Sequence, residues 1–489
     1  MTEIPDLSLL SDKGLFKEHS FIGGTWCSAT SGKVLNITMP ASNTILGSIP
    51  DCGEIDTFKA IEVAEEAFHS WKNMSFDQRA SMLEKWAGLM DDHENDLAIL
   101  LSLEQGKPLV EAKGEIAYGT SFIKWFAQEA RRVGGSVIPA PGTDRRIVTL
   151  KEPVGVSAII TPWNFPNAMI TRKVGPALAA GCSVVIKPSE LTPYSALALG
   201  VLAERAGIPA GVINIVTGMP TAIGNALTSS PIVRKLSFTG STRVGSLLMA
   251  QSAPTVKRLS LELGGNAPFI VFNDADIDKA VESAMESKFR NGGQTCVCAN
   301  RILVQSSIYE EFAKKLVTKV IALKVGPGLE EHCDIGPMIN KDAIDKISVH
   351  IKDAIDKGAQ VLGKAPIPNG ELYTSPTILG ECNTSMLVAN EETFGPVAPL
   401  FRFETEEEAI SIANDTPYGL AAYFFTDNVY RAWRISEALE FGMVGLNTGS
   451  VSTTISPFGG IKQSGLGREG SSVGIDEYLE IKTFHMGGF

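Results

Sequence analysis

The sequence predicts an α/β protein built from parallel sheets and crossover helices, and three observations lead to that class. Its 489 residues are enough for about three structural units of roughly 150 residues each. Hydrophobic residues make up 44% of the chain and charged residues 20%, as in ordinary globular proteins. From residue 150 onward, short β-rich runs alternate with helical segments, which is the pattern of parallel strands joined by helices.

The charge of the chain excludes some classes of partner. Lys and Arg number 43 against 55 Asp and Glu, so the net charge is −12. No run of basic residues is longer than two, so we expect neither nucleic acid nor an anionic membrane surface as a partner. The first ten residues carry no basic segment of a secretory signal, and no stretch of 18 apolar residues occurs.

Cysteine and histidine usage indicates a cytoplasmic protein without a metal site. The seven cysteines are odd in number, scattered and without a CxxC pair, which is typical of a reducing compartment. The six histidines show no spacing typical of zinc ligands. We therefore expect no structural disulfide and no bound metal.

The N-terminal region is predicted to be helical. Apolar residues recur at helical spacing between residues 61 and 71, and a capping box of Ser75 and Gln78 precedes a second helical pattern that reaches residue 101. These patterns are marked by Ile61, Ala64, Phe68 and Trp71, and by Leu83, Trp86, Met90, Leu97 and Leu101.

The following region is predicted to form the parallel sheets. Strands are expected at 154–160, 183–186, 212–216 and 235–238, and later at 301–304, 401–403 and 443–446. One helix should have Thr192 as its N-cap, Pro193 in its first turn and Gly207 past its end; another should span 277–289. Two extended segments, 134–146 and 478–485, are expected to form arms for subunit contacts.

Two patterns indicate a nucleotide site. Gly240, Ser241 and Gly245 lie in a turn between a predicted strand and a helix, where free N–H groups favour a pyrophosphate. This turn is neither GxGxxG nor a P-loop, and an ordinary tight turn is the alternative. Lys187 and Glu190 end another strand, where an ammonium and a carboxylate could hold a ribose; a solvated strand end is the alternative.

Three residues carry the chemistry of a carbonyl reaction. Cys296 follows a glycine-rich loop and is a candidate nucleophile, although cysteine is more often a small buried hydrophobe. Glu262 lies between apolar residues, which should raise its pKa toward that of a general base, unless it is a buried salt-bridge partner. Asn164 lies between two prolines and could donate to an oxyanion, or merely cap a turn.

Together these segments resemble the aldehyde dehydrogenase superfamily over nearly the whole chain. The resemblance rests on seven motifs in the family's order: Pro162-Trp-Asn-Phe-Pro166, Lys187 with Glu190, Phe238-Thr-Gly-Ser-Thr242 to Gly245, Leu261-Glu-Leu-Gly-Gly265, Gly293-Gln-Thr-Cys296, Glu391-Glu-Thr-Phe-Gly-Pro396 and Pro457-Phe-Gly-Gly460. It implies a Rossmann-like cofactor domain (1–130 and 150–262), a second α/β catalytic domain (263–455) and a small β oligomerisation element (131–149 and 470–489).

The resemblance also implies a role for each site residue. Cys296 would attack the aldehyde, Asn164 and the Cys296 N–H would stabilise the oxyanion, and Glu262 would activate the water that releases the acid. The cofactor-binding residues that it implies are Trp163, Lys187, Glu190, Gly240, Ser241, Gly245, Glu392 and Phe394. By the same resemblance we expect a homodimer or homotetramer.

Further motifs resemble the succinate-semialdehyde dehydrogenases within that superfamily. They are Met169-Ile-Thr-Arg172 to Pro176, Lys288-Phe-Arg290-Asn, Cys296-Val-Cys298-Ala-Asn300 and Gly465-Leu-Gly-Arg-Glu-Gly470. The resemblance implies that Arg172, Arg290 and Ser452 bind the substrate carboxylate, which a guanidinium fork matches well. The alternatives are a surface salt bridge for Arg172 and a helix-closing cation for Arg290.

Several alternatives stay open at this stage. Glutarate semialdehyde is one methylene longer than succinate semialdehyde. An enzyme can use one methylene for only about 1–3 kcal/mol of discrimination between two substrates, so both aldehydes are candidates. A cysteine hydrolase or acyltransferase, or a silent binding protein on the same fold, would need no redox step. Glu190 should repel a 2′-phosphate, so NAD is expected over NADP, which stays possible. Cys298 could form a strained regulatory disulfide with Cys296, or could simply pack.

Overall fold

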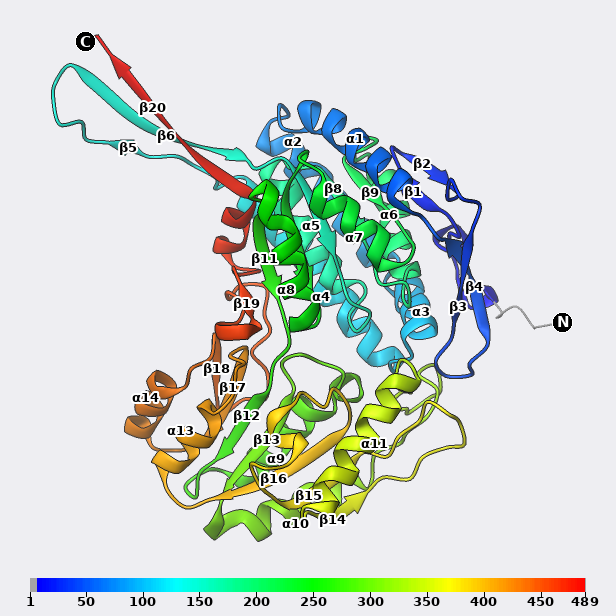
Figure 1. Ribbon diagram of the computed structural model, residues 1–489, viewed down its shortest axis with the longest axis vertical. Coiled ribbons are helices and arrows are strands. Elements are labelled where there is room, and N and C mark those ends of the chain that lie inside the picture. The colour runs from blue at the N-terminus through cyan, green and yellow to red at the C-terminus, as the bar shows by residue number, and fades with distance from the viewer. Residues whose placement is uncertain (1–6, 489) are drawn as a thin grey trace.

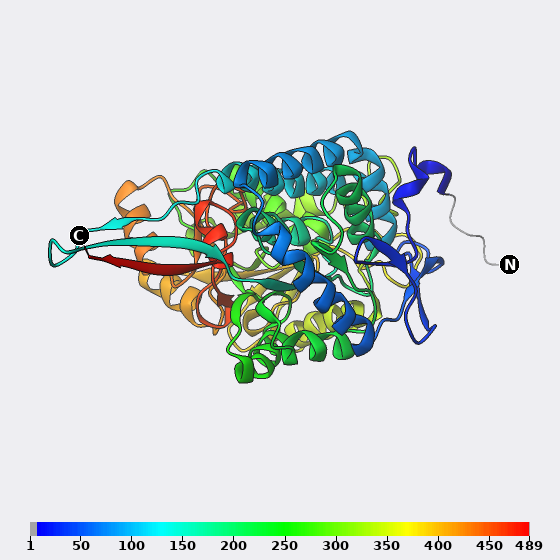
Figure 2. The same cartoon turned by 90° about the horizontal axis from the view of Figure 1, so that it is seen from above.

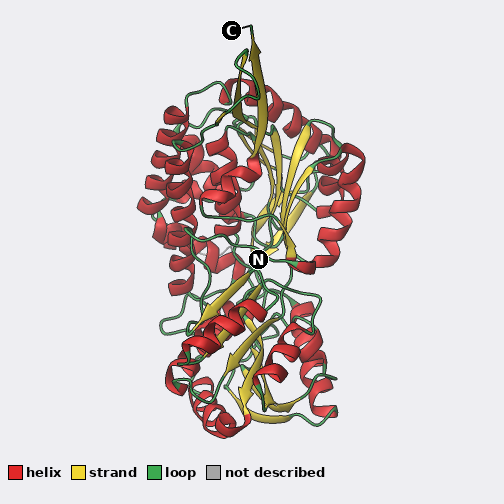
Figure 3. Ribbon diagram, turned by 90° about the vertical axis from the view of Figure 1, so that its left-hand side faces the viewer, coloured by secondary structure: helices red, strands yellow, loops and turns green. Residues whose placement is uncertain are grey.

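The computed structural model describes residues 7–488, which form two α/β units and a projecting β arm (Figure 1). Each unit has a central sheet covered by helices on both sides (Figure 3). Seen from above, the arm extends well beyond the body of the molecule and contains the C-terminal strand (Figure 2). Within residues 7–488, no helix is both long enough and apolar enough to cross a membrane.

The first unit contains an eight-stranded sheet with a Rossmann-type core. Its strands are β1 (Ser20–Ile22), β2 (Thr25–Cys27), β7 (Val156–Ile160), β8 (Val184–Lys187), β9 (Ile213–Ile215), β10 (Val233–Thr239), β11 (Arg258–Glu262) and β19 (Gly465–Leu466). Five of them are parallel in the order β9-β8-β7-β10-β11, with the first strand in the middle. The chain therefore reverses its direction of winding between β7 and β10, which is where such sheets bind ligands.

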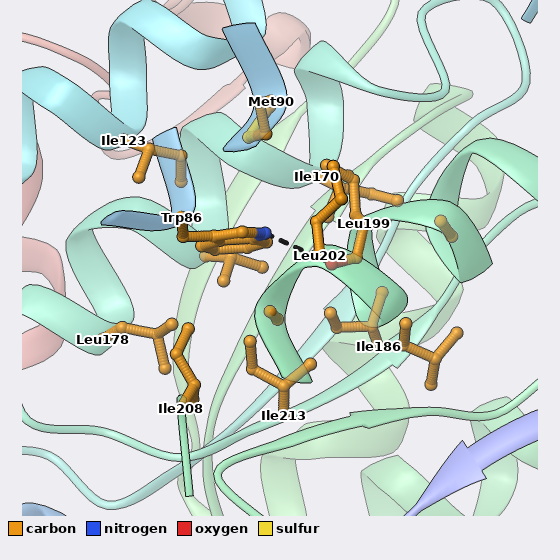
Figure 4. Close-up of a cluster of buried hydrophobic side chains, with 14 of the residues drawn as sticks. Trp86, Met90, Ile123, Ile170, Leu178, Ile186, Leu199, Leu202, Ile208 and Ile213 are labelled. Atoms are coloured by element: carbon orange, nitrogen blue, oxygen red, sulfur yellow. Dashed lines mark hydrogen bonds between the residues drawn. The ribbon is translucent and has the colours of Figure 1, made fainter. Parts of the chain in front are cut away.

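Helices cover both faces of this sheet. They are α1 (Glu54–Trp71), α2 (Phe76–Asp92), α3 (Glu94–Gln105), α4 (Leu109–Ala130), α5 (Ala168–Ala180), α6 (Tyr194–Ala206), α7 (Pro220–Ser229) and α8 (Thr242–Ser252). One face packs against α1, α7 and α8, and the other against α2 to α6. The core between the sheet and helices α2 to α6 is the larger of the two. Trp86 lies in this core, and its indole N–H donates to the Leu199 carbonyl at 3.2 Å (Figure 4).

The second unit is built on a seven-stranded sheet. Its strands are β12 (Ala267–Val271), β13 (Ala299–Gln305), β14 (Gln360–Lys364), β15 (Thr377–Cys382), β16 (Val397–Phe403), β17 (Ala421–Phe425) and β18 (Met443–Leu446). Its helices are α9 (Ile277–Phe289), α10 (Tyr309–Val320), α11 (Lys341–Asp356), α12 (Leu387–Asn390), α13 (Glu406–Asn414) and α14 (Val429–Ala438). Only β14 runs antiparallel to its neighbour among these strands.

Two smaller sheets complete the described chain. The arm consists of β5 (Val137–Ile138), β6 (Arg145–Pro153) and β20 (Leu479–Gly487), so segments more than 300 residues apart in sequence pair along its length. A separate hairpin joins β3 (Val34–Thr38) to β4 (Ile45–Pro50). Before β20, a 3₁₀ segment at Ser472–Tyr478 packs against the first core through Ile475 and Tyr478.

The structure corrects two sequence-based predictions about helices. The pattern predicted from Ser75 to residue 101 is divided at His93, which ends α2 and precedes α3, with its ring bonded to the Leu89 carbonyl at 2.8 Å. Thr192 does not cap α6, which begins at Tyr194 after Pro193. Its first N–H groups donate instead to Glu104 of α3, at 2.6 and 2.8 Å, so a distant carboxylate replaces the local cap.

Candidate active site

The candidate site lies where the two units meet. The loops after β7 and β10 leave the carboxyl edge of the first sheet, and the chain passes from β11 directly into β12 of the second unit. The loop before β13 brings the predicted nucleophile to the same place. A cavity of about 360 Å³ opens there, at the point where the first sheet changes its direction of winding.

Most of the predicted site residues line this cavity. They are Trp163, Asn164, Arg172, Gly240, Ser241, Arg290, Cys296, Glu392, Phe394 and Ser452. Four predicted residues do not form its wall: Lys187, Glu190, Gly245 and Glu262. The predicted nucleophile, the predicted oxyanion donor and the three predicted carboxylate ligands therefore line the same cavity, although they lie far apart in the sequence, from Asn164 to Ser452.

Cys296 is held in a loop that packs tightly against the start of the second unit. A side chain on Gly265 would lie 2.5 Å from the Cys296 carbonyl oxygen, so only glycine fits there. The thiol is half-buried, and burial raises its pKa to about 12; Glu392 adds to this effect and Arg172 opposes it. This raised pKa makes the sulfur a neutral thiol at physiological pH.

Asn164 is fixed by the nucleophile loop itself. Its side-chain amide donates to the Gln294 carbonyl at 2.9 Å, and its own carbonyl accepts from Asn291 at 2.9 Å and from Lys107 at 2.8 Å. Lys107 is fully buried and is paired with Glu115 at 2.6 Å. One amide hydrogen of Asn164 is left for another acceptor, as an oxyanion donor requires.

Glu262 lies at the carboxyl end of β11 and is not among the residues that line the cavity. Its main-chain carbonyl accepts from the Gly240 N–H at 3.0 Å, which connects it to the predicted phosphate turn. One carboxylate oxygen is buried without a hydrogen-bond partner among residues 7–488. Burial raises the pKa of Glu262 well above its ordinary value, and the neighbouring Glu469 raises it further. A general base has this character.

Arg172 is not a surface residue. It is 2% exposed, and its Nε lies 2.7 Å from Glu469, which also pairs with Lys173. Its guanidinium stacks 3.9 Å from the centre of the Phe458 ring. The Nη2 group has no hydrogen-bond partner among the described residues. Arg172 thus keeps one buried, unpaired donor while Glu469 holds its other edge.

Arg290 supplies a second cation to the same cavity. It follows α9, and its guanidinium lies 5.0 Å from the centre of the Phe165 ring. It makes no salt bridge with any residue in the described part of the chain. Ser452 lines the cavity with it and also a smaller adjoining one of about 10 Å³. The two arginines and the serine therefore form a cationic end of the cavity, where Glu469 is the only carboxylate among residues 7–488 that forms a salt bridge with either arginine.

The phosphate turn has the local geometry that a pyrophosphate needs. Ser241 is the N-cap of α8 and accepts from the Val244 N–H. A side chain on Gly240 would lie 2.4 Å from the Phe238 ring, and one on Gly245 would lie 2.5 Å from Leu263. Both glycines thus allow close packing around the start of α8, and Gly240 and Ser241 line the cavity. The residues present fit a dinucleotide at this edge.

The predicted ribose ligands occupy two places around that turn. Lys187 ends β8 and pairs with Glu190 at 2.5 Å, so they contact each other. Burial lowers the pKa of Lys187, and Glu190 opposes that effect. On the other side, Glu392 accepts from the Gly265 N–H at 3.2 Å, and burial raises its pKa to about 7. Phe394 meets Trp163 edge to face, with ring centres 5.6 Å apart.

Sequence reasoning missed several residues of the site. Lys107 holds the Asn164 loop, Glu469 holds Arg172, Lys346 donates to the Glu392 carbonyl, and Tyr118 lines the cavity. Glu469 lies inside the Gly465 to Gly470 motif, so its position was marked but its role was not. Tyr118 lies within the helix α4 and belongs to no motif, so no pattern in the sequence points to it. Only the structure shows that this residue lines the cavity.

Cys298 does not line the cavity, although Thr295, Cys296 and Val297 do. It is buried, and its sulfur lies 3.4 Å from the Gly293 carbonyl and 3.7 Å from the Lys288 ammonium. All seven cysteines are free thiols in the structure. A disulfide with Cys296 stays a hypothesis.

The fold and the site define a class of enzyme: a two-unit dehydrogenase in which the predicted nucleophile, Cys296, lines a cavity beside the glycine turn that precedes α8. The chain belongs to the aldehyde dehydrogenase family, whose sequence profile matches residues 26–484. It is an NAD(P)-dependent aldehyde dehydrogenase with the fold of that family. The predicted family and fold class are thereby confirmed, and the hydrolase and the silent binding protein are set aside.

The relatives of the chain are of nearly equal similarity. It is 55% identical over 480 residues to an NADP(+) succinate-semialdehyde dehydrogenase of Escherichia coli, with 98% of this chain and 99% of the relative covered. It is 54% identical over 473 residues to a glutarate-semialdehyde dehydrogenase of Pseudomonas putida, covering 97% and 98%. The crystal structure of succinate-semialdehyde dehydrogenase from Burkholderia pseudomallei superposes with a TM-score of 0.97 at 55% identity, covering 98% and 99%.

Proposed function

We propose that this enzyme oxidises succinate semialdehyde, or a close ω-carboxy aldehyde, to the dicarboxylic acid. The observation that carries the proposal is the cationic end of the cavity that Cys296 lines. Arg172 has an unpaired, buried Nη2, and Arg290 has no acidic partner among residues 7–488. A buried guanidinium N–H group without an acceptor is costly, and a substrate carboxylate would supply the acceptor that the Arg172 Nη2 group lacks.

The nucleophile and the oxyanion donor act at the other end of the substrate. The Cys296 thiol first loses its proton to solvent, and the resulting thiolate attacks the aldehyde carbon, so that negative charge develops on the carbonyl oxygen. The free amide hydrogen of Asn164 and the Cys296 N–H donate to that oxygen, and they need no reorganisation because Asn291, Gln294 and Lys107 already hold the Asn164 loop. A bound NAD(P) would supply the hydride acceptor for this step: the C–H hydrogen of the thiohemiacetal would leave with its two electrons, its O–H proton would pass to solvent, and a thioester would remain on Cys296.

Glu262 would then act as the general base in the second half of the reaction, in which the thioester is hydrolysed and the dicarboxylic acid is released. Its unpaired carboxylate oxygen can accept a proton from a water molecule, and that water attacks the thioester carbon. The sulfur of Cys296 leaves and is reprotonated, which restores the thiol. Gly240, Ser241 and Gly245 would hold the pyrophosphate, Lys187 and Glu190 the adenosine ribose, and Trp163, Glu392 and Phe394 the nicotinamide end.

Replacing Arg290 by alanine tests the proposal. We expect KM for succinate semialdehyde to rise about 10- to 100-fold, because a charge-assisted hydrogen bond to the carboxylate is lost. KM for butanal, which has the same chain length and no carboxylate, should change less than about twofold. Initial rates at 340 nm measure both, with Arg132→Ala, on the surface of the first unit, as the matched control. Equal effects on the two aldehydes would refute the proposal.

Glutarate semialdehyde is the second candidate, because a relative of equal similarity carries that name. It presents the same carboxylate at one more methylene, so it would use the same two arginines. The ratio of kcat/KM values for the two semialdehydes in one assay decides between them. A value within about tenfold of unity would assign both substrates to this enzyme.

We further propose that NAD is preferred over NADP. Glu190 is 30% exposed at the end of β8, where its charge would repel a 2′-phosphate and its oxygens could accept from a 2′-hydroxyl. The Escherichia coli relative is named for NADP(+), so the preference has to be measured for this chain.

Glu190→Ser should shift the NADP to NAD ratio of kcat/KM values toward NADP by about tenfold or more, because it removes a repulsive charge and opens space. Glu204→Ser, on the surface of the neighbouring helix α6, should leave the ratio unchanged. An unchanged ratio in Glu190→Ser would contradict the assignment.

The arm supports a homodimer or homotetramer. Val137 on β5 and Ile481 and Phe484 on β20 expose 78%, 69% and 48% of their surface, and a second copy could cover them. We propose that the chain divides into a cofactor domain (1–130 and 150–262), a catalytic domain (263–455) and oligomerisation arms (131–149 and 470–489). The free cysteines are consistent with a cytoplasmic location.

A further inference from the structure

Tyr118 brings an unused hydroxyl into the substrate cavity. It lies on α4, and its ring packs edge to face on Phe122, with ring centres 4.8 Å apart. The ring also packs against the small apolar cluster of Phe165, Ala168 and Met169. These contacts fix the ring through its carbon atoms, so the hydroxyl is not needed to hold the side chain in place.

The hydroxyl oxygen is buried but has no hydrogen-bond partner among residues 7–488. A buried hydroxyl normally finds a partner, and one that does not is either a cost or a place for a ligand. Tyr118 lines the same cavity as Arg172, Arg290 and Cys296. The missing acceptor is therefore most simply supplied by a molecule in that cavity.

The charges around the hydroxyl select the kind of acceptor. Burial raises the pKa of Tyr118, so the phenol is neutral and can donate at physiological pH. After burial, the strongest electrostatic influences on it come from the two cavity arginines, Arg172 and Arg290. A neutral donor beside two cations, one of which has an unpaired Nη2, suits an anion with several acceptor oxygens.

We propose that the Tyr118 hydroxyl donates a hydrogen bond to the ω-carboxylate of the substrate, between Arg172 and Arg290. Three donors from three elements (α4, α5 and the end of α9) would then surround one carboxylate. Tyr118 thereby becomes a determinant of specificity for carboxylated over uncharged aldehydes. This inference rests on the proposed function.

Tyr118→Phe tests the role because it removes the oxygen and keeps the ring packing. We expect kcat/KM for succinate semialdehyde to fall about 10- to 100-fold, the usual effect of losing a hydrogen bond to a charged group. The value for butanal should stay within about twofold. Binding of succinate, measured by calorimetry without turnover, should weaken by a similar factor.

A matched control is Tyr373→Phe, which removes a hydroxyl bonded to the Ala41 carbonyl at 3.2 Å and lies outside the cavity. It should keep the wild-type preference. If Tyr118→Phe reduced activity equally on both aldehydes, the hydroxyl would act at Cys296 or in folding, and the inference would fail. A wild-type preference that survives in Tyr118→Phe would also overturn it. A wild-type enzyme with no preference would instead overturn the proposed function, and this inference with it.

Discussion

Cys296→Ala is expected to reduce kcat for aldehyde oxidation by at least about 10⁴-fold. The substitution removes the atom that forms the covalent intermediate, and the remaining binding groups cannot replace it. The dissociation constant for NAD should change less than about threefold, because the dinucleotide turn on α8 does not depend on the sulfur. Production of NADH at 340 nm and a fluorescence titration with NAD measure the two effects.

Cys333→Ala is the matched control for that experiment. Its sulfur is also half-buried, but it bonds to the Gly326 and Ile335 carbonyls, both at 3.3 Å, outside the cavity. We expect kcat to be unchanged in this variant. Retention of substantial oxidation in Cys296→Ala would contradict the assignment of the nucleophile.

Glu262→Gln is expected to lower steady-state kcat by about 10²- to 10⁴-fold, because a general base is lost while the size of the side chain is kept. The first turnover does not use this base in the mechanism. A burst of about one equivalent of NADH per active site should therefore precede the slow phase in stopped-flow measurements. A slow phase without a burst would place Glu262 in the first half of the reaction instead.

The same variant has a pH signature. The base form of Glu262 is the carboxylate, and burial raises its pKa, so the steady-state rate of the wild type should climb as pH rises through that raised pKa. Glu262→Gln should lack this rise. The burst rate should increase with pH in both enzymes, because the thiolate fraction of Cys296 grows toward its pKa of about 12. Glu129→Gln, a buried glutamate on α4 away from the cavity, should behave as wild type.

The sequence predicted the local elements well where a single segment carries the signal. The strands of the parallel core, the helix at 277–289 and the glycine turn before α8 are all present, because hydrophobic period and turn chemistry are local properties. The prediction was wrong at Thr192, because α6 is capped by Glu104 from another helix. The prediction was also incomplete at His93, which separates α2 from α3. The spacing of apolar residues continues from one helix into the next, so it does not reveal the break between them.

By itself, the sequence determined the family of this protein and predicted which groups carry its chemistry. The thiol, the carboxylate and the amide are marked by their neighbours in the chain, so their types and their order were readable before any contact was known.

Only the tertiary structure decided how these groups are paired. It holds Arg172 against Glu469 and leaves the Arg172 Nη2 group without a partner. It buries one Glu262 carboxylate oxygen without a partner, and it brings Tyr118 to the cavity from a helix that carries no motif. The physical reason is that burial and pairing set the pKa of a group and its free hydrogen bonds. Both depend on neighbours that are far away in the chain.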